Sequence, residues 1–522
     1  MDLFSCILTF GLALTAILLV IDFCLHRSRI GRRVAEIPGP RGFPIIGNLL
    51  DFAVPYDEIF LRLRKFGKEF YPTYKYWILH RPLVNIRHPD DIQIILSSPI
   101  NIEKTQHSDL LRPWVKEGLL ISKGKKWQDR RKMVNHAFTY NLLEEFVETF
   151  VEQTSRLLAT LKVEANVQGG EVVKEVEPIF SRLSFNIICE TAMGIVLDDK
   201  DREQYDYLNA IRALAGIFQF RLTRPWLAND WIFSLTKKSK EQAKALGKIH
   251  TFSKKIIEAR KNYHRMNGWQ FLNEPSKKTG RETDDTAING KRRNHGKLAL
   301  LDLLIATWKT SGIDDQGIQE EVDMFVAAGY DTTSTALSFA TLVLAEHRDI
   351  QEKCRKEINE VLNGTPVEKI TMKEVQKMKY LQQCIKEAMR LYGVTPLIGR
   401  KLSEDVQLKN HFLPRGTEVA IHLYDAHRDP HFWSEPNVFN PDRFSPEGSK
   451  GRHPYSYLPF SIGPRDCIGK KFAMLELKVV IAGLISNFYL EPVDVIGDKR
   501  FIMDFIMRCS EPMHVKLVPI TK

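Results

Sequence analysis

The first hydrophobic feature of the chain is a nearly unbroken apolar run from Leu3 to Leu25, interrupted only by small polar residues, cysteines and Asp22. A helix needs about 20 apolar residues to cross a bilayer, so the run predicts a membrane-spanning helix. The basic flank from His26 to Arg33 belongs on the cytoplasmic side by the positive-inside rule. A cleaved signal peptide is the alternative, but Asp2 stands where such a peptide has a basic region, and no small-x-small site ends the run. We therefore expect a retained anchor at residues 1–25, with the rest of the chain in the cytosol.

A basic and proline-rich segment follows at residues 26–48. Pro38, Pro40 and Pro44 hold the backbone extended and prevent the anchor helix from continuing. The segment predicts a stiff hinge between the anchor and a single large domain at residues 49–522.

Beyond the hinge, most apolar positions recur with helical spacing. The segments predicted to be helical are 142–161, 176–193, 243–263, 298–310, 319–346, 350–362, 381–392 and 472–489. Two short runs, Tyr74–Ile78 and Leu83–Ile86, predict a small sheet. The polar stretch 267–297 predicts a mobile surface loop. The expected fold class is mainly α with small β-sheets (α+β).

The composition is that of a folded globular protein, with 43% apolar and 27% charged residues in 522. The net charge of +11 comes from 75 basic and 64 acidic residues, without a dense basic tract interleaved with aromatics. This mild excess favours an anionic membrane surface or an acidic protein partner over nucleic acid. The seven cysteines are scattered and form no Cys-x-x-Cys pair, so they support neither a disulfide framework nor a structural zinc site.

One cysteine, Cys467, stands in a turn-rich segment from Phe460 to Gly469, just before a helical stretch. Gly463 and the proline after it force a turn, and Gly469 lets backbone come close to the sulfur. The sulfur is expected at a helix N-terminus, where the dipole and Arg465 favour the thiolate. A buried structural thiol is the alternative for an isolated cysteine. The pattern F-x-x-G-x-R-x-C-x-G resembles the haem-binding loop of the cytochrome P450 family, in which the thiolate is the axial ligand of the iron.

A second motif, Ala328-Gly329-Tyr330-Asp331-Thr332-Thr333, interrupts the long apolar helix expected at 319–346. Its hydroxyls can displace a backbone hydrogen bond, so a simple helix bend is the alternative. The motif resembles the A-G-x-D-T-T oxygen-activating groove of the same family. By that resemblance, Ala328 and Gly329 leave room for dioxygen. Thr332 then donates a hydrogen bond to the oxygen bound at the iron, and Asp331 feeds protons from water.

The resemblance also implies haem contacts. Trp127 and Arg131, at i and i+4, share one helix face and match the partners of a haem propionate. Arg400 and Arg465 match two further propionate positions, which suits the bidentate preference of arginine for carboxylates. Solvation at the surface is the alternative for each of these residues.

Glu387 and Arg390, at i and i+3, can pair on one helix face. Such pairs are usually weak surface bridges. Downstream, the segment 439–444 resembles the P-x-R-F meander of the family. Its arginine, Arg443 here, completes a buried Glu-Arg-Arg cluster with a structural role near the thiolate loop.

The likeness extends from the hinge to about Leu517, and segments 127–138, 427–430 and 452–460 resemble the fourth cytochrome P450 family, known for fatty-acid ω-hydroxylation. One position departs from the pattern. Many members of that family carry Glu where this chain has Ala328, and that Glu can esterify a haem methyl. We therefore expect non-covalent haem b, and the terminal-carbon selectivity associated with the ester is not carried over.

The resemblance implies a monooxygenase of the endoplasmic reticulum membrane that inserts one atom of O₂ into a C–H bond of a small apolar substrate. Fatty acids lead, with steroids, terpenoids and xenobiotics as alternatives. Two other functions stay open: an isomerase or dehydratase that needs no reductase, against which Asp331 and Thr332 argue, and a non-catalytic haem-binding lipid sensor.

The chain has neither a Rossmann glycine fingerprint nor a flavin-binding module. Electrons are therefore expected from a separate NADPH-cytochrome P450 reductase, with cytochrome b5 as a further partner. Basic residues beside the thiolate loop are expected to steer that acidic partner, although a solvated charged face is the alternative. These residues are Lys126, Arg130, Lys132, Lys470 and Lys471.

Overall fold

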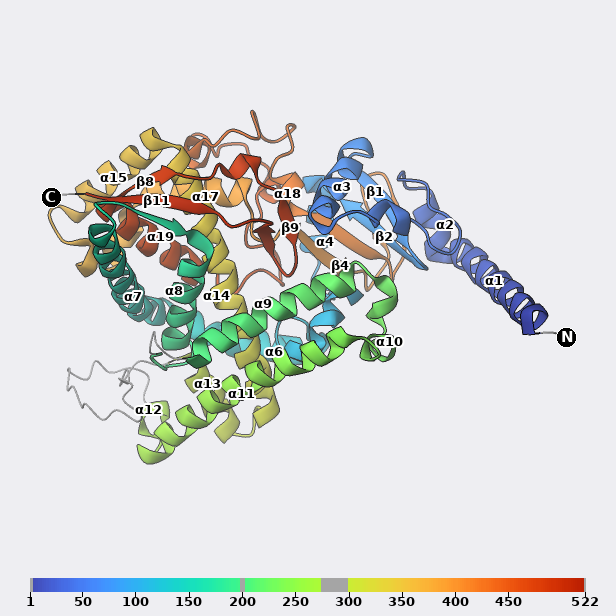
Figure 1. Cartoon of the computed structure of the whole chain (residues 1–522), viewed down its shortest axis with the longest axis horizontal. Coiled ribbons are helices and arrows are strands. Elements are labelled where there is room, and N and C mark those ends of the chain that lie inside the picture. Colours follow the sequence, from blue (N-terminus) through green and yellow to red (C-terminus); the bar gives the residue numbers. More distant parts are fainter. Residues whose placement is uncertain (1–2, 198–201, 274–298, 521–522) are drawn as a thin grey trace.

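The body of the protein is built around one long helix, α14 (Asp315–Glu346), in a computed structural model that describes residues 3–197, 202–273 and 299–520 (Figure 1). Apolar and small side chains lie on most of its circumference, and such a helix is stable only when most of its surface is covered. Nearly every residue from Gly317 to Ala345 is buried.

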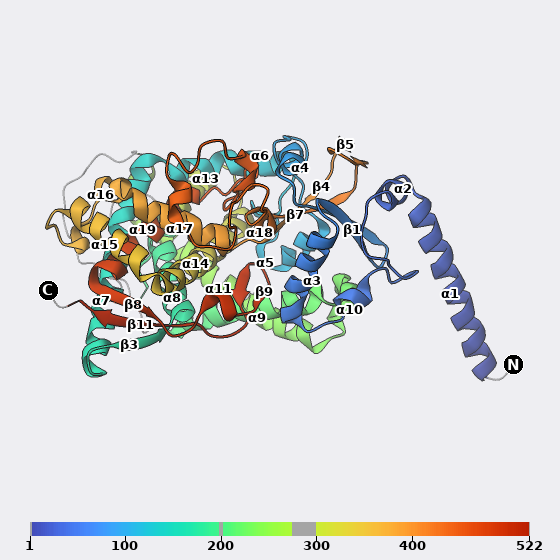
Figure 2. The ribbon, with the colours of Figure 1, turned by 90° about the horizontal axis from the view of Figure 1, so that it is seen from above.

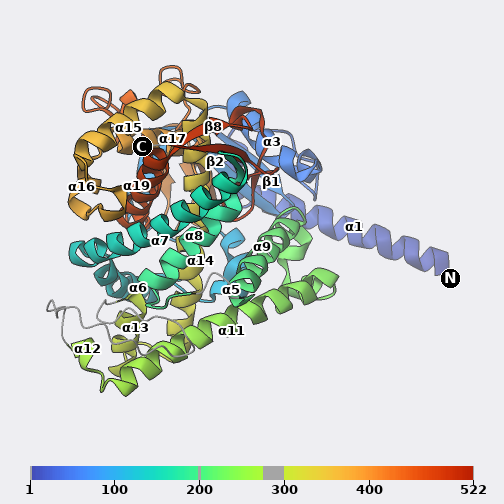
Figure 3. The same cartoon turned by 60° about the vertical axis from the view of Figure 1, so that its left-hand side comes forward.

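Several helices pack against α14, among them α8, α11 and α17, and α9 runs side by side with α11 across one end of the body (Figures 1 and 3). The major helices around α14 are α7 (Tyr140–Val167), α8 (Val176–Thr191), α9 (Arg202–Leu222), α11 (Lys237–Met266), α13 (Leu300–Lys309), α15 (Arg348–Leu362), α17 (Lys379–Leu391) and α19 (Lys470–Asn487).

The larger sheet has the strand order β1-β2-β7-β4 and lies at the end of the body from which the N-terminal helix emerges (Figure 2). It combines the predicted hairpin, β1 (Thr73–Ile78) and β2 (Arg81–Ile86), with β7 (Glu418–His422) and β4 (Leu397–Lys401). β2 and β7 are parallel, whereas the other two pairs are antiparallel. The smaller sheets are β3 (Val172–Glu175) with β11 (His514–Pro519) and β8 (Phe488–Pro492), β9 (Phe501–Met503) with β10 (Met507–Cys509), and β5 (Val406–Gln407) with β6 (Phe412–Leu413).

Short helices join these elements. The α-helical ones are α2 (Arg29–Ala35), α3 (Tyr56–Glu69), α4 (Pro89–Leu96), α5 (Arg112–Val115), α6 (Gly124–Asn135), α10 (Asp230–Ser234), α12 (Gln270–Asn273), α16 (Met372–Lys377) and α18 (Leu423–Ala426). The 3₁₀ turns are η1 (Leu49–Phe52), η2 (Gln106–Leu111), η3 (His136–Phe138), η4 (Pro225–Ala228), η5 (Val367–Lys369), η6 (Pro441–Phe444), η7 (Pro454–Ser456) and η8 (Ile496–Asp498).

All eight predicted helices are confirmed, each with ends shifted by a few residues. Helix α9 was not predicted, and most of the predicted mobile loop, residues 274–298, lies outside the described residues. The structure is mainly α with small sheets, as expected.

The N-terminal run forms α1 (Leu3–Arg27), the one helix among the described residues long and apolar enough to cross a membrane. It projects away from the body in every view (Figures 1–3). At its end the His26 ring stacks on Trp77 of β1, with centroids 4.2 Å apart.

The predicted hinge is not a free spacer. Its first part is helix α2, capped by the Ser28 hydroxyl. Its second part lies along β1, where the Lys75 N–H donates to the Pro38 carbonyl at 2.9 Å and the Asn48 N–H to the Trp77 carbonyl at 2.6 Å. The proline-rich segment is therefore fastened to the sheet.

Candidate active site

The segment around Cys467 is a tight turn that leads into α19. The Cys467 N–H donates to the Phe460 carbonyl at 2.9 Å, and the Asp466 N–H to the Gly463 carbonyl at 3.0 Å. Gly463 has φ +83°, and a Cβ there would overlap the Leu96 carbonyl oxygen, so glycine is required. Gly469 is the N-cap of α19, which places the sulfur at a helix N-terminus as predicted.

Cys467 is exposed to solvent, yet many protein atoms lie around its thiol. Burial raises the pKa of the thiol, whereas the Gly469 N–H and the more distant charges of Arg131 and Lys470 lower that pKa by less. The expectation that Arg465 favours the thiolate is wrong for the protein alone, because the guanidinium points to carbonyl groups instead. A metal cation bonded to the sulfur would stabilise the thiolate.

Arg465 is held by three backbone carbonyls. Nε donates to Ile102 and Nη1 to Leu119, both at 3.1 Å, and Nη2 donates to Ser122. The guanidinium also stacks over the Trp127 ring, with its carbon 4.3 Å from the ring centre. Burial, followed by the charges of Arg400 and Arg131, lowers the pKa of Arg465 to about 9.

Arg400 is a buried cation that lacks a carboxylate partner among the described residues. Its side chain is 2% exposed, and its one hydrogen bond there goes to the neighbouring Gly399 carbonyl at 2.9 Å. Burial lowers the pKa of Arg400 to about 10. A buried guanidinium without a counter-ion is costly, so this position calls for an external anion.

Lys104 is the site residue that the sequence analysis missed. It is half-buried and makes no side-chain hydrogen bond or ion pair within the described part of the chain. Burial, together with the charges of Arg400 and Arg465, holds the pKa of Lys104 well below its usual range. A single lysine in a loop carries no local sequence signal that could have revealed it.

Arg131 lies on α6 one turn after Trp127, as predicted, but its partner is the turn that holds the cysteine. Nη1 donates to the Asp466 carbonyl at 2.8 Å and Nη2 to the Asp466 carboxylate at 2.5 Å. Lys470 donates to the other carboxylate oxygen of Asp466 at 2.8 Å. Arg131 therefore fixes the residue next to Cys467 and has fewer N–H groups left for a propionate than expected.

These residues fit a haem with a cysteine ligand. Arg400 and Arg465 are close enough to lower the pKa of Lys104, and Arg400 also lowers the pKa of Arg465, while no carboxylate in the described residues pairs with Lys104 or Arg400. The two propionates of a haem carry the missing negative charge. Gly469 adds to the fit, because a Cβ there would lie 4.0 Å from the sulfur and protein contacts alone do not demand glycine.

The middle of α14 is the part of this helix that is open. Ala328 is exposed, and Gly329 and Thr332 are half-buried, whereas the neighbouring residues are buried. The Thr332 hydroxyl donates to the Ala328 carbonyl at 2.6 Å, the back-bonding that the sequence suggested. Gly329 also has a packing role, since a Cβ there would lie 2.5 Å from Ile188 Cδ1 of α8.

The resemblance implied that Asp331 exchanges protons with water, but in the structure its carboxylate is held by an arginine. It is buried and accepts two hydrogen bonds from Arg508 Nη2, at 2.5 and 2.6 Å. Arg508 Nε donates to Asp504 at 3.1 Å, so the turn between β9 and β10 is tied to α14. Burial raises the pKa of Asp331, and Arg508 opposes that rise. Arg508 is a second residue that sequence reasoning missed.

Glu387, Arg390 and Arg443 come together as predicted. Arg390 donates from Nε and Nη2 to the Glu387 carboxylate at 2.7 and 2.8 Å, and both side chains are fully buried. Arg443 adds a contact of 3.3 Å to the same carboxylate. Arg390 also donates to the carbonyls of His427 and Pro436, at 2.9 and 2.7 Å. The cluster ties α17 to the segment that precedes the cysteine turn.

The basic residues assigned to partner docking differ in their availability. Arg130 is 12% exposed and donates to the Gly317 carbonyl at 3.1 Å, so it supports α14. Lys126 pairs with Glu320 at 2.8 Å. Lys470 is half-exposed but bound to Asp466. Lys132 and Lys471 are exposed and have no ion pair within the described residues.

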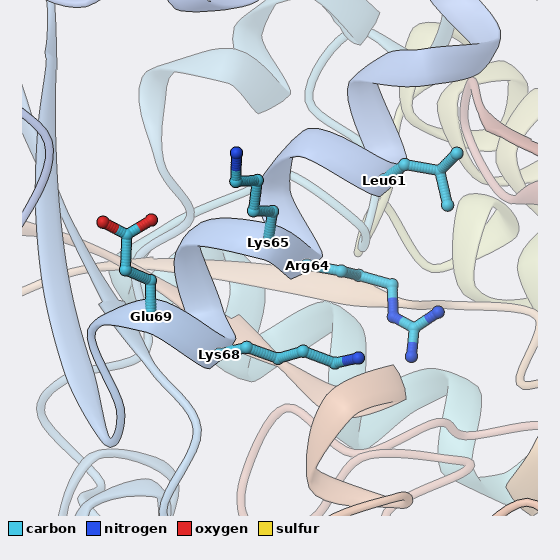
Figure 4. A pocket seen from close by; sticks show the side chains of 5 residues that line it. All are labelled: Leu61, Arg64, Lys65, Lys68 and Glu69. Atoms are coloured by element: carbon cyan, nitrogen blue, oxygen red, sulfur yellow. The ribbon is translucent and has the colours of Figure 1, made fainter.

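A hollow of about 490 Å³ lies elsewhere, along α3 (Figure 4). All five of its lining residues come from that one helix, from Leu61 to Glu69. Arg64 is held by Asp425 at 3.2 Å. The hollow contains none of the residues described above, so it does not belong to the site.

Comparison with known proteins bears on the site. The model of the family described as Cytochrome P450 matches residues 37–516. Cytochrome P450 4c3 of Drosophila melanogaster is 34% identical over 521 residues, which cover 99% of this chain and 95% of that protein. Cytochrome P450 4d2 of the same organism is 34% identical over 508 residues, 97% of each chain. Cytochrome P450 4V2 of Rattus norvegicus is 31% identical over 512 residues, 96% of this chain and 93% of that protein.

Proposed function

This chain belongs to the cytochrome P450 family and is a haem-thiolate monooxygenase, and we propose that it hydroxylates a fatty acid or a related lipid at a membrane. The observation that carries the assignment of its site is the cysteine turn itself. Cys467 is accessible at the start of α19, in a turn that requires Gly463 and is fastened by Arg131.

Four groups of this chain would hold the haem. Cys467 would bind the iron, and Arg400, Lys104 and Trp127 would contact the propionates. Trp127 is 7% exposed, and its indole N–H has no protein acceptor in the described residues. Bound haem with a cysteine ligand supplies the chemistry that splits dioxygen and inserts one oxygen atom into a C–H bond. Ala328 offers no carboxylate for an ester, so the haem is non-covalent haem b.

The residues of α14 supply and orient protons. Thr332 presents a hydroxyl at the open stretch of the helix, and Asp331 stands beside it with its charge balanced by Arg508. A proton can leave Asp331 only when its carboxyl is protonated, and the ion pair to Arg508 opposes that. Release of Asp331 from Arg508 is thus a step that this chain controls.

The experiment that tests the axial ligand is optical. Recombinant protein loaded with haem, reduced and exposed to carbon monoxide, should give the spectrum of a thiolate-bound iron. An imidazole-like spectrum, or undiminished turnover in Cys467→Ala, would overturn the assignment. Cys509→Ala, which removes a half-buried cysteine outside the turn, is the control.

The substrate is proposed to be a long apolar molecule because aromatic side chains gather next to the site. Phe505, in the turn between β9 and β10, lies 5.3 Å from Trp114 of α5 and 4.8 Å from Phe218 of α9, between ring centres. That turn is joined to α14 through Arg508. Titration of purified protein with fatty acids, steroids and terpenoids, read by the haem spin-state shift, ranks these classes. A larger shift with steroids than with any fatty acid would contradict the proposal.

Electrons are proposed to come from a separate NADPH-dependent flavoprotein reductase, with cytochrome b5 as a further donor. Lys132 and Lys471 are exposed cations without an ion pair in the described part of the chain, and they could attract an acidic partner. With the reductase added, NADPH consumption should depend on substrate and yield hydroxylated product. An isomerase, a dehydratase or a lipid sensor would form no such product.

The proposed location is the endoplasmic reticulum membrane, with α1 as the anchor and the body in the cytosol. The basic residues after α1 support this orientation. Protease protection in microsomes tests it, because only α1 should be shielded.

A further inference from the structure

A cavity of about 280 Å³ lies where the anchor meets the larger sheet. One wall comes from the junction of α1 and α2 and includes Leu25 and Ser28. The other walls come from the sheet and include His80, Arg81, Lys401 and Glu418. The cavity has the volume of about nine water molecules, which is enough for a phosphate ester.

The strand register places the charged side chains on one face of the sheet. Glu418 of β7 pairs with Leu83 of β2 on one side and with Lys401 of β4 on the other. Paired residues point to the same face, and so does Arg81, two positions before Leu83. Arg81, Glu418 and Lys401 therefore converge at one end of the sheet, beside the anchor.

The cations in this cavity lack carboxylate partners among the described residues. Arg81 has one contact, 3.4 Å from Nε to the His80 ring, and Lys401 has no side-chain hydrogen bond or ion pair there. Glu418 is engaged instead with the Gln106 N–H, at 2.8 Å. Two positive groups thus face the cavity, and a single carboxylate, already bonded, lies between them.

The anchor sets the depth of this cavity in the membrane. About 20 residues of helix span the hydrocarbon layer, and α1 runs for 25 residues up to Arg27. Leu25, which lines the cavity, therefore lies at the cytosolic edge of that layer, among lipid headgroups. The stacking of His26 on Trp77 holds the sheet at the same level.

We propose that this cavity binds the phosphate headgroup of an anionic phospholipid from the cytosolic leaflet. Arg81 offers paired N–H donors to the phosphate oxygens, and Lys401 supplies the second charge. Leu25 and Ile30 contact the apolar part of the same lipid. The site goes beyond the proposed hydroxylation and rests on the proposed anchor.

The test uses full-length holoprotein in nanodiscs of phosphatidylcholine with a minor share of phosphatidylserine. After gentle extraction, native mass spectrometry counts the lipids that remain bound. The unchanged protein should retain one phosphatidylserine, and Arg81→Gln/Lys401→Gln should reduce that retention at least tenfold. Arg27→Gln/Arg32→Gln is the matched control, because it removes two charges from the same flank outside the cavity and should retain the lipid.

Three results would overturn the proposal. The cavity variant could retain phosphatidylserine as well as the unchanged protein does. The flank variant could lose as much lipid as the cavity variant, which would mean diffuse surface charge. Finally, glycerol phosphate could displace the lipid at equal concentration, which would mean a soluble phosphate ligand.

Flotation with lipid vesicles distinguishes a failure of the proposed anchor from a failure of the proposed lipid site. A protein that does not float with vesicles of pure phosphatidylcholine lacks a working anchor. A protein that floats with them but shows no preference for phosphatidylserine has the anchor and lacks the site.

Discussion

Arg508 donates two hydrogen bonds to Asp331, at 2.5 and 2.6 Å, across 177 residues of sequence. This pair joins the turn between β9 and β10, which carries Phe505, to the open stretch of α14. The position of Phe505 and the surroundings of the Asp331 carboxyl are therefore linked through one pair of side chains.

Replacing Arg508 by Met should change proton delivery. The substitution leaves Asp331 buried without its counter-ion, so the pKa of Asp331 rises further and the carboxyl stays protonated. A carboxyl with too high a pKa releases its proton slowly, so we expect a loss of about 10- to 100-fold in coupled turnover, with the pH profile shifted to higher pH. The amount of product formed per NADPH consumed, measured between about pH 6 and 9, shows both the loss of coupled turnover and the shift of the pH profile. Arg508→Lys, which keeps the charge, should restore part of the coupling, and an unchanged pH profile in Arg508→Met would contradict the role.

The Glu387–Arg390 pair should be essential for folding. Glu387→Gln leaves the fully buried guanidinium of Arg390 without its counter-ion, which costs about 3–5 kcal/mol of unfolding free energy. Arg443→Gln removes a contact of 3.3 Å to Glu387 and a hydrogen bond of 2.9 Å to the Glu435 carbonyl. The Arg443 side chain is 11% exposed, so this substitution should cost less. Urea denaturation measures both variants. Equal losses would mean that burial of the pair does not determine its contribution.

The turn before the cysteine should not accept a side chain at Gly463. Gly463→Ala combines a φ of +83° with an overlap on the Leu96 carbonyl, and we expect a loss of at least about 2 kcal/mol, together with poor haem incorporation. Gly451→Ala is the control. Its φ is +75° and nothing lies within 4 Å of the added Cβ, so it should cost about 1 kcal/mol.

Glu476 should make stability fall as the pH rises. Burial raises the pKa of Glu476 to about 8, while the unfolded chain titrates near its ordinary value of 4.5. Between these values the folded protein binds the proton that the unfolded chain releases, so the free energy of unfolding decreases with pH up to about 8.

Glu476→Gln should remove most of that decrease, a difference of about 1–3 kcal/mol. Thermal unfolding at pH values on either side of the transition measures it. Burial also raises the pKa of Glu321, to about 7, so a smaller decrease of the same sign should remain. A variant as pH-dependent as the unchanged protein would contradict the role of Glu476.

Charge reversal at Lys471 should slow the reduction of the haem by the proposed flavoprotein. Charge reversal at Arg130 should have a smaller effect on docking. Lys471 is exposed and unpaired in the described residues, whereas Arg130 is bound to the Gly317 carbonyl. Lys471→Glu should lower the reduction rate several-fold at low salt and converge with the unchanged protein at high salt. A rate that is insensitive to salt in both proteins would count against electrostatic docking.

The sequence predicted what depends on local pattern. The long helices follow from apolar periodicity, and the cysteine turn follows from Gly463 and Gly469. The spacing of Glu387 and Arg390 predicted that they can pair, and the resemblance to the family implied that the pair is buried, as the structure has it.

What escaped prediction depends on contacts between distant segments. The strands β7 and β4 join a hairpin formed more than three hundred positions earlier in the numbering. Arg508, the partner of Asp331, comes from the hairpin of β9 and β10. Arg131 was expected to contact only a propionate, but it binds Asp466. Lys104 became visible only when folding placed it beside Arg400 and Arg465.

The fastening of the proline-rich segment to β1, with His26 stacked on Trp77, has a consequence for encounters. If α1 is the membrane anchor proposed above, a body tied this closely to it moves within the plane of the bilayer and tilts very little. Encounters with other membrane proteins then take place in two dimensions. The orientation of the body, and therefore the face that a partner meets, is set before contact.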